Sequence, residues 1–311
     1  MEQKTDHMIN GFSRELQDGV GRVVLGKEHA IHLAVTTLLA GGHLLIEDKP
    51  GVGKTLLARA LARCLDVPFQ RVQCTADLLP ADIIGAHIYH PTTGDISFRP
   101  GPVFTSILVA DELNRTPPRT QSALLQCMAE GRITLDRETR DLPDPFFVVA
   151  TQNPMTFPGT YPLPESQLDR FLMRIRLGYP ETESEIDIVT QEDGHRALDD
   201  LQPIASREQL REAQRAVDKV TLQRDLAAYM VELAHRTRSS TEVALGVSPR
   251  GAQALHRACR ARAVSMGRDY VVPEDVRTLL VPVYGHRMSL RGSASAEVVL
   301  QEILSSTPIP D

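Results

Sequence analysis

Short apolar runs alternate with amphipathic stretches over roughly the first 180 residues of the chain. The runs are rich in Val, Ile, Leu and Phe and predict buried strands, whereas the stretches between them repeat apolar residues with the period of a helix. The expected strands are 43–47, 69–73, 107–111, 146–151 and 173–177, and the expected helices are 28–40, 54–65, 117–130 and 165–172. This alternation is typical of an α/β fold, a parallel sheet with helices on both faces.

Two polar segments interrupt this plan and predict β-hairpin insertions. One lies within residues 86–104 and the other within residues 132–142, and each has strand-like residues on both sides of a turn. Their polar tips should project from the core. We interpret His87 and His90 as surface residues of the first hairpin, because no acidic or cysteine residue flanks them at the spacing of metal ligands.

After residue 180 the pattern changes to helices alone. Apolar residues recur on one helical face in 206–220, 222–234 and 249–266, and Pro273 begins a further helix with acidic residues in its first turn. We therefore predict two domains, an α/β core at 1–180 and a small all-α domain at 181–311.

Composition narrows the class of protein. The length of 311 residues fits about two domains, and the net charge of −6 argues against a protein that coats nucleic acid. The four cysteines are scattered in apolar contexts, which favours buried thiols over a metal site or disulfides. Residues 1–11 lack the apolar segment of a signal peptide, and the apolar stretch 31–46 is too short and too polar to span a bilayer. We expect a cytoplasmic protein without membrane insertion.

The segment LLIEDKPGVGKT has the pattern of a phosphate-binding loop between a strand and a helix. Gly51 and Gly53 allow backbone amides to approach a polyphosphate, Lys54 can reach its β- and γ-phosphates, and Thr55 can ligate Mg²⁺. The motif ordinarily begins with glycine, and Asp48 stands at that position. A Rossmann site is a poorer interpretation, because it requires G-x-G-x-x-G and gives no role to the lysine.

Three polar residues follow buried strands. The strand 107–111 ends in Asp111 and Glu112. With a phosphate loop upstream, Asp111 can hold the hydration shell of Mg²⁺, and Glu112 can polarise the water that attacks a γ-phosphate. Asn153 follows another strand and could orient the same water, since open α/β sheets bind ligands at the carboxyl ends of their strands. Taken alone, the strand end at Asp111 and Glu112 favours a capping or turn role, and Asn153 followed by Pro154 is also compatible with the start of a turn.

Two arginines lie at helix ends. Arg170, near the end of 165–172, could pair with Asp169, lie in solvent, or reach the γ-phosphate of a neighbouring subunit. Arg250 lies in the first turn of a helix that Ser248 caps. A positive charge there opposes the helix dipole, so a nearby anion would explain Arg250.

In this order, the motifs resemble those of the AAA+ ATPases. The segments LLIEDKPGVGKT, VADELNRTPPRTQSALLQCMAEG, VVATQNP, YPLPESQLDRFL and GVSPRGAQAL resemble more closely the MoxR family, over about residues 24–288. Asp48 fits this family, which commonly carries Glu-Gly or Glu-Asp there. The resemblance implies a P-loop AAA+ core with β-hairpin insertions and a small all-α lid domain.

The resemblance also assigns roles to residues. It implies Glu112, Asn153 (sensor 1), Arg170 (arginine finger) and Arg250 (sensor 2) as catalytic residues, with ATP and Mg²⁺ as cofactors. Thr55 and Asp111 would hold the metal ion. The implied nucleotide-binding residues are Val24, Pro50, Gly51, Val52, Gly53, Lys54, Thr55 and Leu56. Lys27 departs from the family's usual glutamine near the expected adenine pocket.

By the same resemblance, ATP hydrolysis would drive remodelling or assembly of client proteins. The expected partners are other copies in a ring, taken as a hexamer, and a von Willebrand factor A-domain protein. A chelatase-type motor for metal insertion would share every ATPase residue. A DNA-translocating motor needs basic hairpin tips, whereas Asp95, Asp136 and Glu138 lie there, so nucleic acid is not an expected partner. A nucleotide-gated scaffold without hydrolysis disagrees with the intact Glu112 and Arg170.

Overall fold

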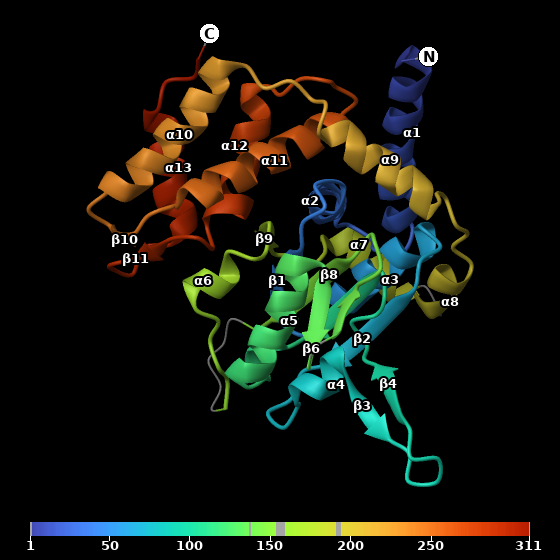
Figure 1. Cartoon of the computed structure of the whole chain (residues 1–311). Coiled ribbons are helices and arrows are strands. Elements are labelled where there is room, and N and C mark those ends of the chain that lie inside the picture. Colours follow the sequence, from blue (N-terminus) through green and yellow to red (C-terminus); the bar gives the residue numbers. More distant parts are fainter. Residues whose placement is uncertain (1, 137, 154–158, 191–193, 311) are drawn as a thin grey trace.

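A five-stranded parallel sheet forms the centre of the computed structural model, which describes residues 2–136, 138–153, 159–190 and 194–310 (Figure 1). The strand order is β2-β5-β8-β1-β9. The strands are β1 (Leu44–Glu47), β2 (Phe69–Gln73), β5 (Ile107–Asp111), β8 (Phe147–Gln152) and β9 (Met173–Ile175). These are the five strands that the sequence predicts, with ends shifted by at most two residues.

Successive side chains of a strand point to opposite faces of the sheet, and each face is covered by its own apolar core. Leu44 and Ile46 face a cluster formed with α1 (Glu2–Gly21), α2 (Glu28–Leu39) and α3 (Lys54–Cys64). Leu45 points to the other face, where α5 (Pro118–Glu130) contributes Leu124 and Leu125. Because both faces are covered, the three central strands β5, β8 and β1 are almost entirely apolar, whereas the edge strands β2 and β9 also carry polar residues.

Both predicted hairpins form, and they contact each other. The first pairs β3 (Gly85–Tyr89) with β4 (Ile96–Pro100) after the short helix α4 (Pro80–Ile84), and the second pairs β6 (Arg132–Leu135) with β7 (Glu138–Asp141). His87 Nδ1 lies 3.0 Å from Asp136 Oδ2, and the Arg140 guanidinium stacks 4.4 Å from the centre of the Phe98 ring. The first hairpin projects from the body of the molecule (Figure 1).

The chain after residue 180 is mostly helical. Its elements are α7 (Thr182–Thr190), α8 (Gly194–Asp199), α9 (Arg207–Val217), α10 (Arg224–Ser239), α11 (Pro249–Ser265), α12 (Pro273–Tyr284), α13 (Ala296–Ser306), β10 (Val243–Leu245) and β11 (Ser289–Leu290). The antiparallel β10–β11 pair adds a small strand element to the helices that the pattern indicated.

The first part of this region packs on the core rather than on the other C-terminal helices. Helix α8 contacts α3, and the backbone amides of Ile204 and Ala205 donate to the carbonyl oxygen of Cys64 at 2.8 and 3.0 Å. Two helices from the start of the chain, α1 and α2, also contact α11 of the helical region. The helical region and the α/β core therefore share one continuous apolar cluster, and a domain boundary at residue 180 stays a prediction.

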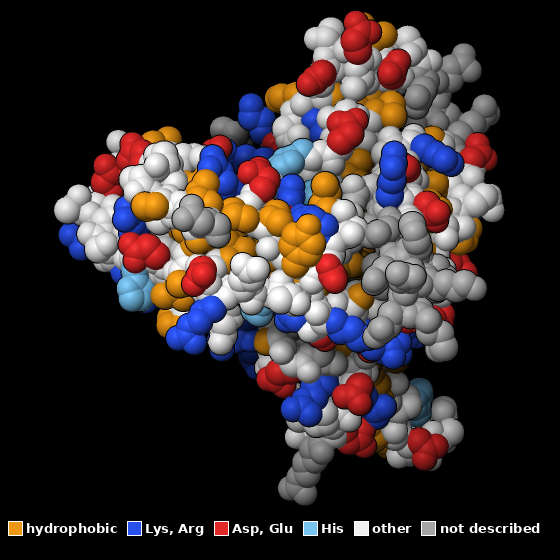
Figure 2. Space-filling view, turned by 90° about the horizontal axis from the view of Figure 1, so that it is seen from above, with side chains coloured by type: hydrophobic (Ala, Val, Ile, Leu, Met, Phe, Trp, Pro, Cys, Tyr) orange, Lys and Arg blue, Asp and Glu red, His pale blue; other side chains and the backbone are white. Residues whose placement is uncertain are grey.

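The surface agrees with the modest net charge. Seen from above the helical region, acidic and basic side chains are interspersed, with apolar side chains between them (Figure 2). Within the described residues, the helices all lack the combination of length and apolar character that crossing a bilayer requires.

Candidate functional site

The turn between β1 and α3 has the backbone conformation of a phosphate-binding loop. Gly51 and Gly53 have φ angles of +86° and +93°, a region that strains any residue with a side chain. An added Cβ would meet no atom within 4 Å at either position, so the backbone conformation and not crowding selects glycine. Gly53 is also the N-cap of α3, which leaves the first amides of the helix open to an anion.

Asp48, the departure from the usual glycine, anchors this loop. Its Oδ2 accepts hydrogen bonds from the backbone amides of Leu177 and Gly178, at 2.8 and 2.6 Å. The loop is thereby tied to the chain that follows β9. The sequence pattern gave no reason for an aspartate here, because these amides lie 129 and 130 residues further along the chain.

Lys54 lies among acidic groups at the loop. Its Nζ donates to the carbonyl oxygen of Asp48 at 2.6 Å. Partial burial lowers the pKa of Lys54, and the carboxylates of Asp111, Asp48 and Glu112 oppose that shift. The ammonium group is therefore partly desolvated and close to where a phosphate would bind the loop amides.

Thr151 holds the two carboxylates at the end of β5. Its hydroxyl donates to Asp111 Oδ1 at 2.6 Å and accepts from the Glu112 amide at 2.9 Å. Glu112 itself has a φ of +59°, a left-handed conformation that turns its side chain away from the strand direction. The Thr151 hydroxyl on β8 thus holds both acidic residues in place. No pattern in the sequence indicated this contact between Thr151 and the end of β5.

Both carboxylates have cationic or amide partners. Arg71 on β2 donates to Asp111 Oδ2 from Nη2 at 2.6 Å and from Nε at 3.2 Å. Glu112 Oε2 accepts from Arg115 Nη1 at 3.0 Å and from Gln73 Nε2 at 3.3 Å. Arg71 and Gln73 come from β2, whose side chains could be assigned to this site only once its pairing with β5 was known.

One cavity of about 750 Å³, a size typical of ligand sites, is bordered by Lys54, Asp111 and Glu112 together with Arg71 and Gln73. It lies at the carboxyl ends of the strands, where α/β sheets bind ligands. Its lining includes Pro50, Gly51, Gly53, Lys54, Thr55, Leu56, Asp111, Glu112 and Asn153, all of which the sequence indicated, and also Arg59, Arg71, Gln73 and Ile188, which it did not.

Val24 and Val52 are placed differently from the other predicted nucleotide contacts. Neither is among the described residues that line the cavity. Val24 is buried, and Val52 packs against the main apolar cluster. The segment after Val24 nevertheless approaches the site, because Gly26 lies against Ser184 of α7, the helix that contributes Ile188 to the cavity.

The two predicted catalytic arginines are also outside the described lining of the cavity. Arg170 is exposed, in a turn just after α6 (Glu165–Leu168). Arg250 Nη1 lies 3.8 Å from Asp169 Oδ2, and its side chain is 73% exposed. The structure therefore brings Arg170 and Arg250 close to the same aspartate, at the junction between the helical region and β9.

The helix predicted over 165–172 is wrong in its length. It ends at Leu168, and the chain then turns so that Phe171 and Leu172 are buried. The carbonyl oxygens of both residues accept hydrogen bonds from the buried Arg287. A distant arginine thus replaces the helical hydrogen bonds that local sequence would otherwise form.

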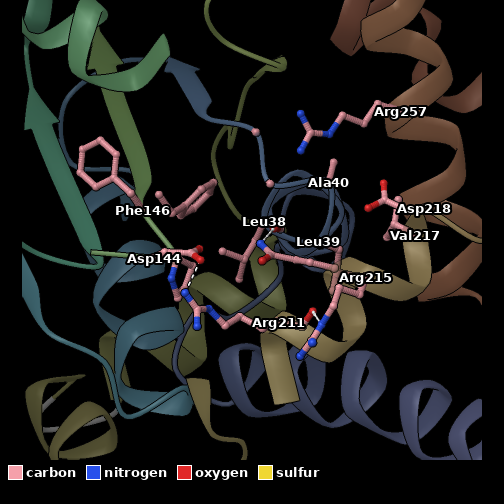
Figure 3. A pocket seen from close by; sticks show the side chains of 15 residues that line it. Leu38, Leu39, Ala40, Asp144, Phe146, Arg211, Arg215, Val217, Asp218 and Arg257 are labelled. Atoms are coloured by element: carbon pink, nitrogen blue, oxygen red, sulfur yellow. Dashed lines mark hydrogen bonds and ion pairs between the residues drawn. The ribbon is translucent and has the colours of Figure 1, made fainter. Parts of the chain in front are cut away.

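A second cavity, of about 480 Å³, lies near the opposite ends of the strands (Figure 3). It is bordered by the end of α2, the start of β8, and helices α9 and α11. Arg211 pairs with the Asp144 carboxylate there, and Gln214 Nε2 donates to the carbonyl oxygen of Leu38 at 2.8 Å. These polar contacts fasten α9 to the α/β core at a point remote from the first cavity.

Fold and site together define a nucleotide-binding α/β protein, and comparison with known families agrees. Residues 43–173 match the ATPase family associated with various cellular activities (AAA), and residues 235–306 match the AAA lid domain. A crystal structure of a candidate ATPase from Cytophaga hutchinsonii superposes with a TM-score of 0.90 at 37% identity, covering 100% of this chain and 98% of that one.

Relatives of similar length narrow the family. YeaC of Bacillus subtilis is 45% identical over 296 residues, which cover 94% of this chain and 92% of that protein. The chaperone MoxR1 of Mycobacterium tuberculosis is 37% identical, covering 94% and 80% of the two chains, and MoxR of Paracoccus denitrificans is 32% identical, covering 96% of each. The chain belongs to the MoxR family of AAA ATPases, and it is an ATPase. The helices after residue 180 therefore include the lid.

Proposed function

We propose that the chain hydrolyses ATP in the 750 Å³ cavity and uses the energy to remodel client proteins. The observation that carries this proposal is the convergence of Lys54, Asp111, Glu112 and Asn153 on one cavity, beside a loop whose glycines are held in the left-handed region. Phosphoryl transfer depends mainly on positioning and charge neutralisation, which these groups supply.

Each residue has a distinct role in this proposal. The loop amides and Lys54 bind the phosphates. Thr55 and Asp111 offer oxygen ligands for Mg²⁺, which when bound would neutralise charge on the phosphates. Glu112 accepts a proton from the attacking water, and Asn153 orients that water by a hydrogen bond. Arg71 Nη2 donates to Asp111 Oδ2 at 2.6 Å, which places a cation beside the carboxylate that would face the hydrated ion.

We assign Arg170 and Arg250 to the site of a neighbouring copy. Both are exposed and lie outside the described lining of their own cavity, while both lie close to Asp169. A guanidinium supplied from a neighbouring subunit is worth roughly 10³–10⁵ in rate in other NTPases. An active site at a subunit contact needs a neighbouring copy, and a closed ring of identical copies completes every site; we propose a hexameric ring.

Client proteins are the proposed substrates of the ring. The name of the Mycobacterium tuberculosis relative, chaperone MoxR1, supports this class of activity. We propose a von Willebrand factor A-domain protein as partner and the cytoplasm as location. Identification of proteins that copurify with an ATP-loaded Glu112→Gln variant tests the partner, and recovery of the variant without any such protein would count against it.

Mixed-ring kinetics test the ATPase mechanism. Glu112→Gln should retain ATP binding and lose at least about 100-fold in turnover, because the general base is gone. Arg170→Ala should also retain binding and lose turnover. Mixing the two variants should restore activity, because an intact Glu112 then meets an intact Arg170 across a contact. Unchanged turnover in Glu112→Gln would refute its role as the base, and failure of the mixture to recover would refute the trans role of Arg170.

A further inference from the structure

Arg287 is a buried arginine whose contacts surround Arg170. It follows α12 in the lid and is only 6% exposed. Its Nε donates to Asp169 Oδ1 at 2.7 Å, its Nη2 to the carbonyl oxygen of Phe171 at 2.6 Å, and its Nη1 to that of Leu172 at 3.1 Å. The residue before Arg170 and the two residues after it are therefore held by one guanidinium.

Neighbouring residues of the lid strengthen the same contact. His286 lies within hydrogen-bond distance of the Phe171 carbonyl oxygen, at 3.0 Å from Nε2. Burial lowers the pKa of His286 well below its ordinary value, and the adjacent Arg287 cation adds to this shift, so the ring is neutral. Nη1 of Arg287 lies 2.8 Å from the same Nε2. From the core side, Arg174 Nη2 donates to the carbonyl oxygen of Gly285 at 3.2 Å. The segment Gly285–Arg287 and the turn 169–172 thus form one hydrogen-bonded unit.

The chemistry of this unit requires arginine. A buried guanidinium is tolerated only when its donors are satisfied, and here they meet one carboxylate and several carbonyl oxygens. Lysine would keep the charge but has no planar fork to reach acceptors on both sides of the turn. Asp169 also lies 3.8 Å from Arg250, so the same carboxylate lies close to both exposed arginines.

We propose that Arg287 is a positioning residue for the arginine finger, through which the lid of one subunit sets the geometry of Arg170 in the next subunit's active site. This inference rests on the proposed trans role of Arg170. Because the groups that fix the turn belong to the lid, Arg170 is correctly placed only while the lid is seated on its own core. Arg287 is not among the described residues that line the 750 Å³ cavity, so its loss should spare nucleotide binding.

Complementation between variants tests this proposal. Arg287→Lys should bind ATP with an affinity within about twofold of the unmodified chain, yet lose about 10- to 100-fold in turnover. Mixed one to one with Glu112→Gln, it should recover about one quarter of the original rate, the share of contacts that pair an intact base with an intact finger. A variant that is merely misfolded would give no recovery.

Two further variants separate the possible outcomes. Asp169→Asn weakens the same unit without removing Arg287 and should show the same recovery, so it replaces Arg287→Lys if that chain does not fold. Arg211→Ala breaks a contact between α9 and the α/β core at the second cavity, and its turnover per folded chain should stay near that of the unmodified protein.

The possible results distinguish the positioning role of Arg287 from the proposed ATPase mechanism. If Arg170→Ala recovers on mixing and neither Arg287→Lys nor Asp169→Asn does, the positioning role is overturned while the proposed ATPase mechanism stands. Turnover in Arg287→Lys equal to that of the unmodified chain also overturns it. If Arg170→Ala itself does not recover, the trans finger fails and this inference fails with it.

Discussion

At the scale of single residues, the site depends on side chains that no motif contains. Thr151 links Asp111 to the Glu112 amide, and Asp48 ties the phosphate loop to the amides after β9. Such supporting contacts decide whether catalytic groups stay within the few tenths of an ångström that transition-state stabilisation requires. The motif residues supply the chemistry, and the supporting residues supply their geometry.

Replacing the Thr151 hydroxyl tests this view. Thr151→Val keeps the shape of the side chain, but it leaves one oxygen of Asp111 and the Glu112 amide without their partner. We expect turnover to fall about 10- to 100-fold, with ATP affinity changing much less, because the phosphate loop is untouched. Steady-state hydrolysis and equilibrium binding of a fluorescent nucleotide measure the two effects.

Thr139→Val provides a matched control. The Thr139 hydroxyl lies 3.1 Å from that of Thr134 in the second hairpin, and neither threonine is among the described residues that line the cavity. The same loss of a hydroxyl there should leave turnover unchanged. Equal losses in both variants would mean that the effect at Thr151 is not specific to the carboxylates.

At the scale of secondary structure elements, buried polar side chains join elements that the apolar pattern treats separately. His43, just before β1, accepts from the Val148 amide of β8 at Nδ1 (3.1 Å), and its Nε2 lies 3.0 Å from the carbonyl oxygen of Met128 in α5. The ring must therefore be neutral, with its proton on Nε2. Burial lowers the pKa of His43 from 6.5 to about 4, with Arg257 adding to the shift and the Met128 hydrogen bond opposing it.

This shift predicts a loss of stability in acid. Because the pKa of His43 in the folded chain is below that in the unfolded chain, its contribution is fully present above pH 6.5 and is lost as the pH falls towards 4. Between pH 7.5 and pH 5 it should lower the free energy of unfolding by about 2 kcal/mol. Urea unfolding at the two pH values measures the difference.

His43→Gln isolates this contribution from those of other buried histidines. Glutamine has one donor and one acceptor group but does not titrate. The variant should be less stable at pH 7.5, yet its free energy of unfolding should change by about 2 kcal/mol less between the two pH values. An identical pH dependence in both proteins would show that His43 takes up no proton on unfolding.

At the scale of the whole molecule, the described chain holds most of an active site at one place and its candidate arginines at another. Lys54, Asp111, Glu112 and Asn153 line the cavity, while Arg170 and Arg250 lie at the lid junction near Asp169. A ring of identical copies would join the two surfaces at every contact. Assembly and hydrolysis should therefore be coupled.

Dilution tests this coupling. Turnover per chain should fall steeply as the protein concentration drops below that at which rings assemble, because each site then loses its arginine. Light scattering on the same samples reports assembly. The residual rate of an Arg170→Ala, Arg250→Ala double variant should not depend on concentration in this way. A constant rate per chain across dissociation of the ring would contradict a shared active site.

Local patterns in the sequence determined the five strands, both hairpins, the helical second region and the motif residues around the cavity, because apolar period, turn residues and motif order are properties of neighbouring residues. Family resemblance added the interpretation of the helical region as a lid and the catalytic roles of the two arginines. Only the tertiary structure decided that α6 ends at Leu168 and which groups bind Asp48 and Thr151. It also decided that Val24 is not among the described residues that line the cavity, and that Arg287 binds the turn 169–172. The physical reason is that a buried polar group takes its partner from whatever packs against it, and chain folding brings that partner from far along the chain, 130 residues away in the case of Asp48.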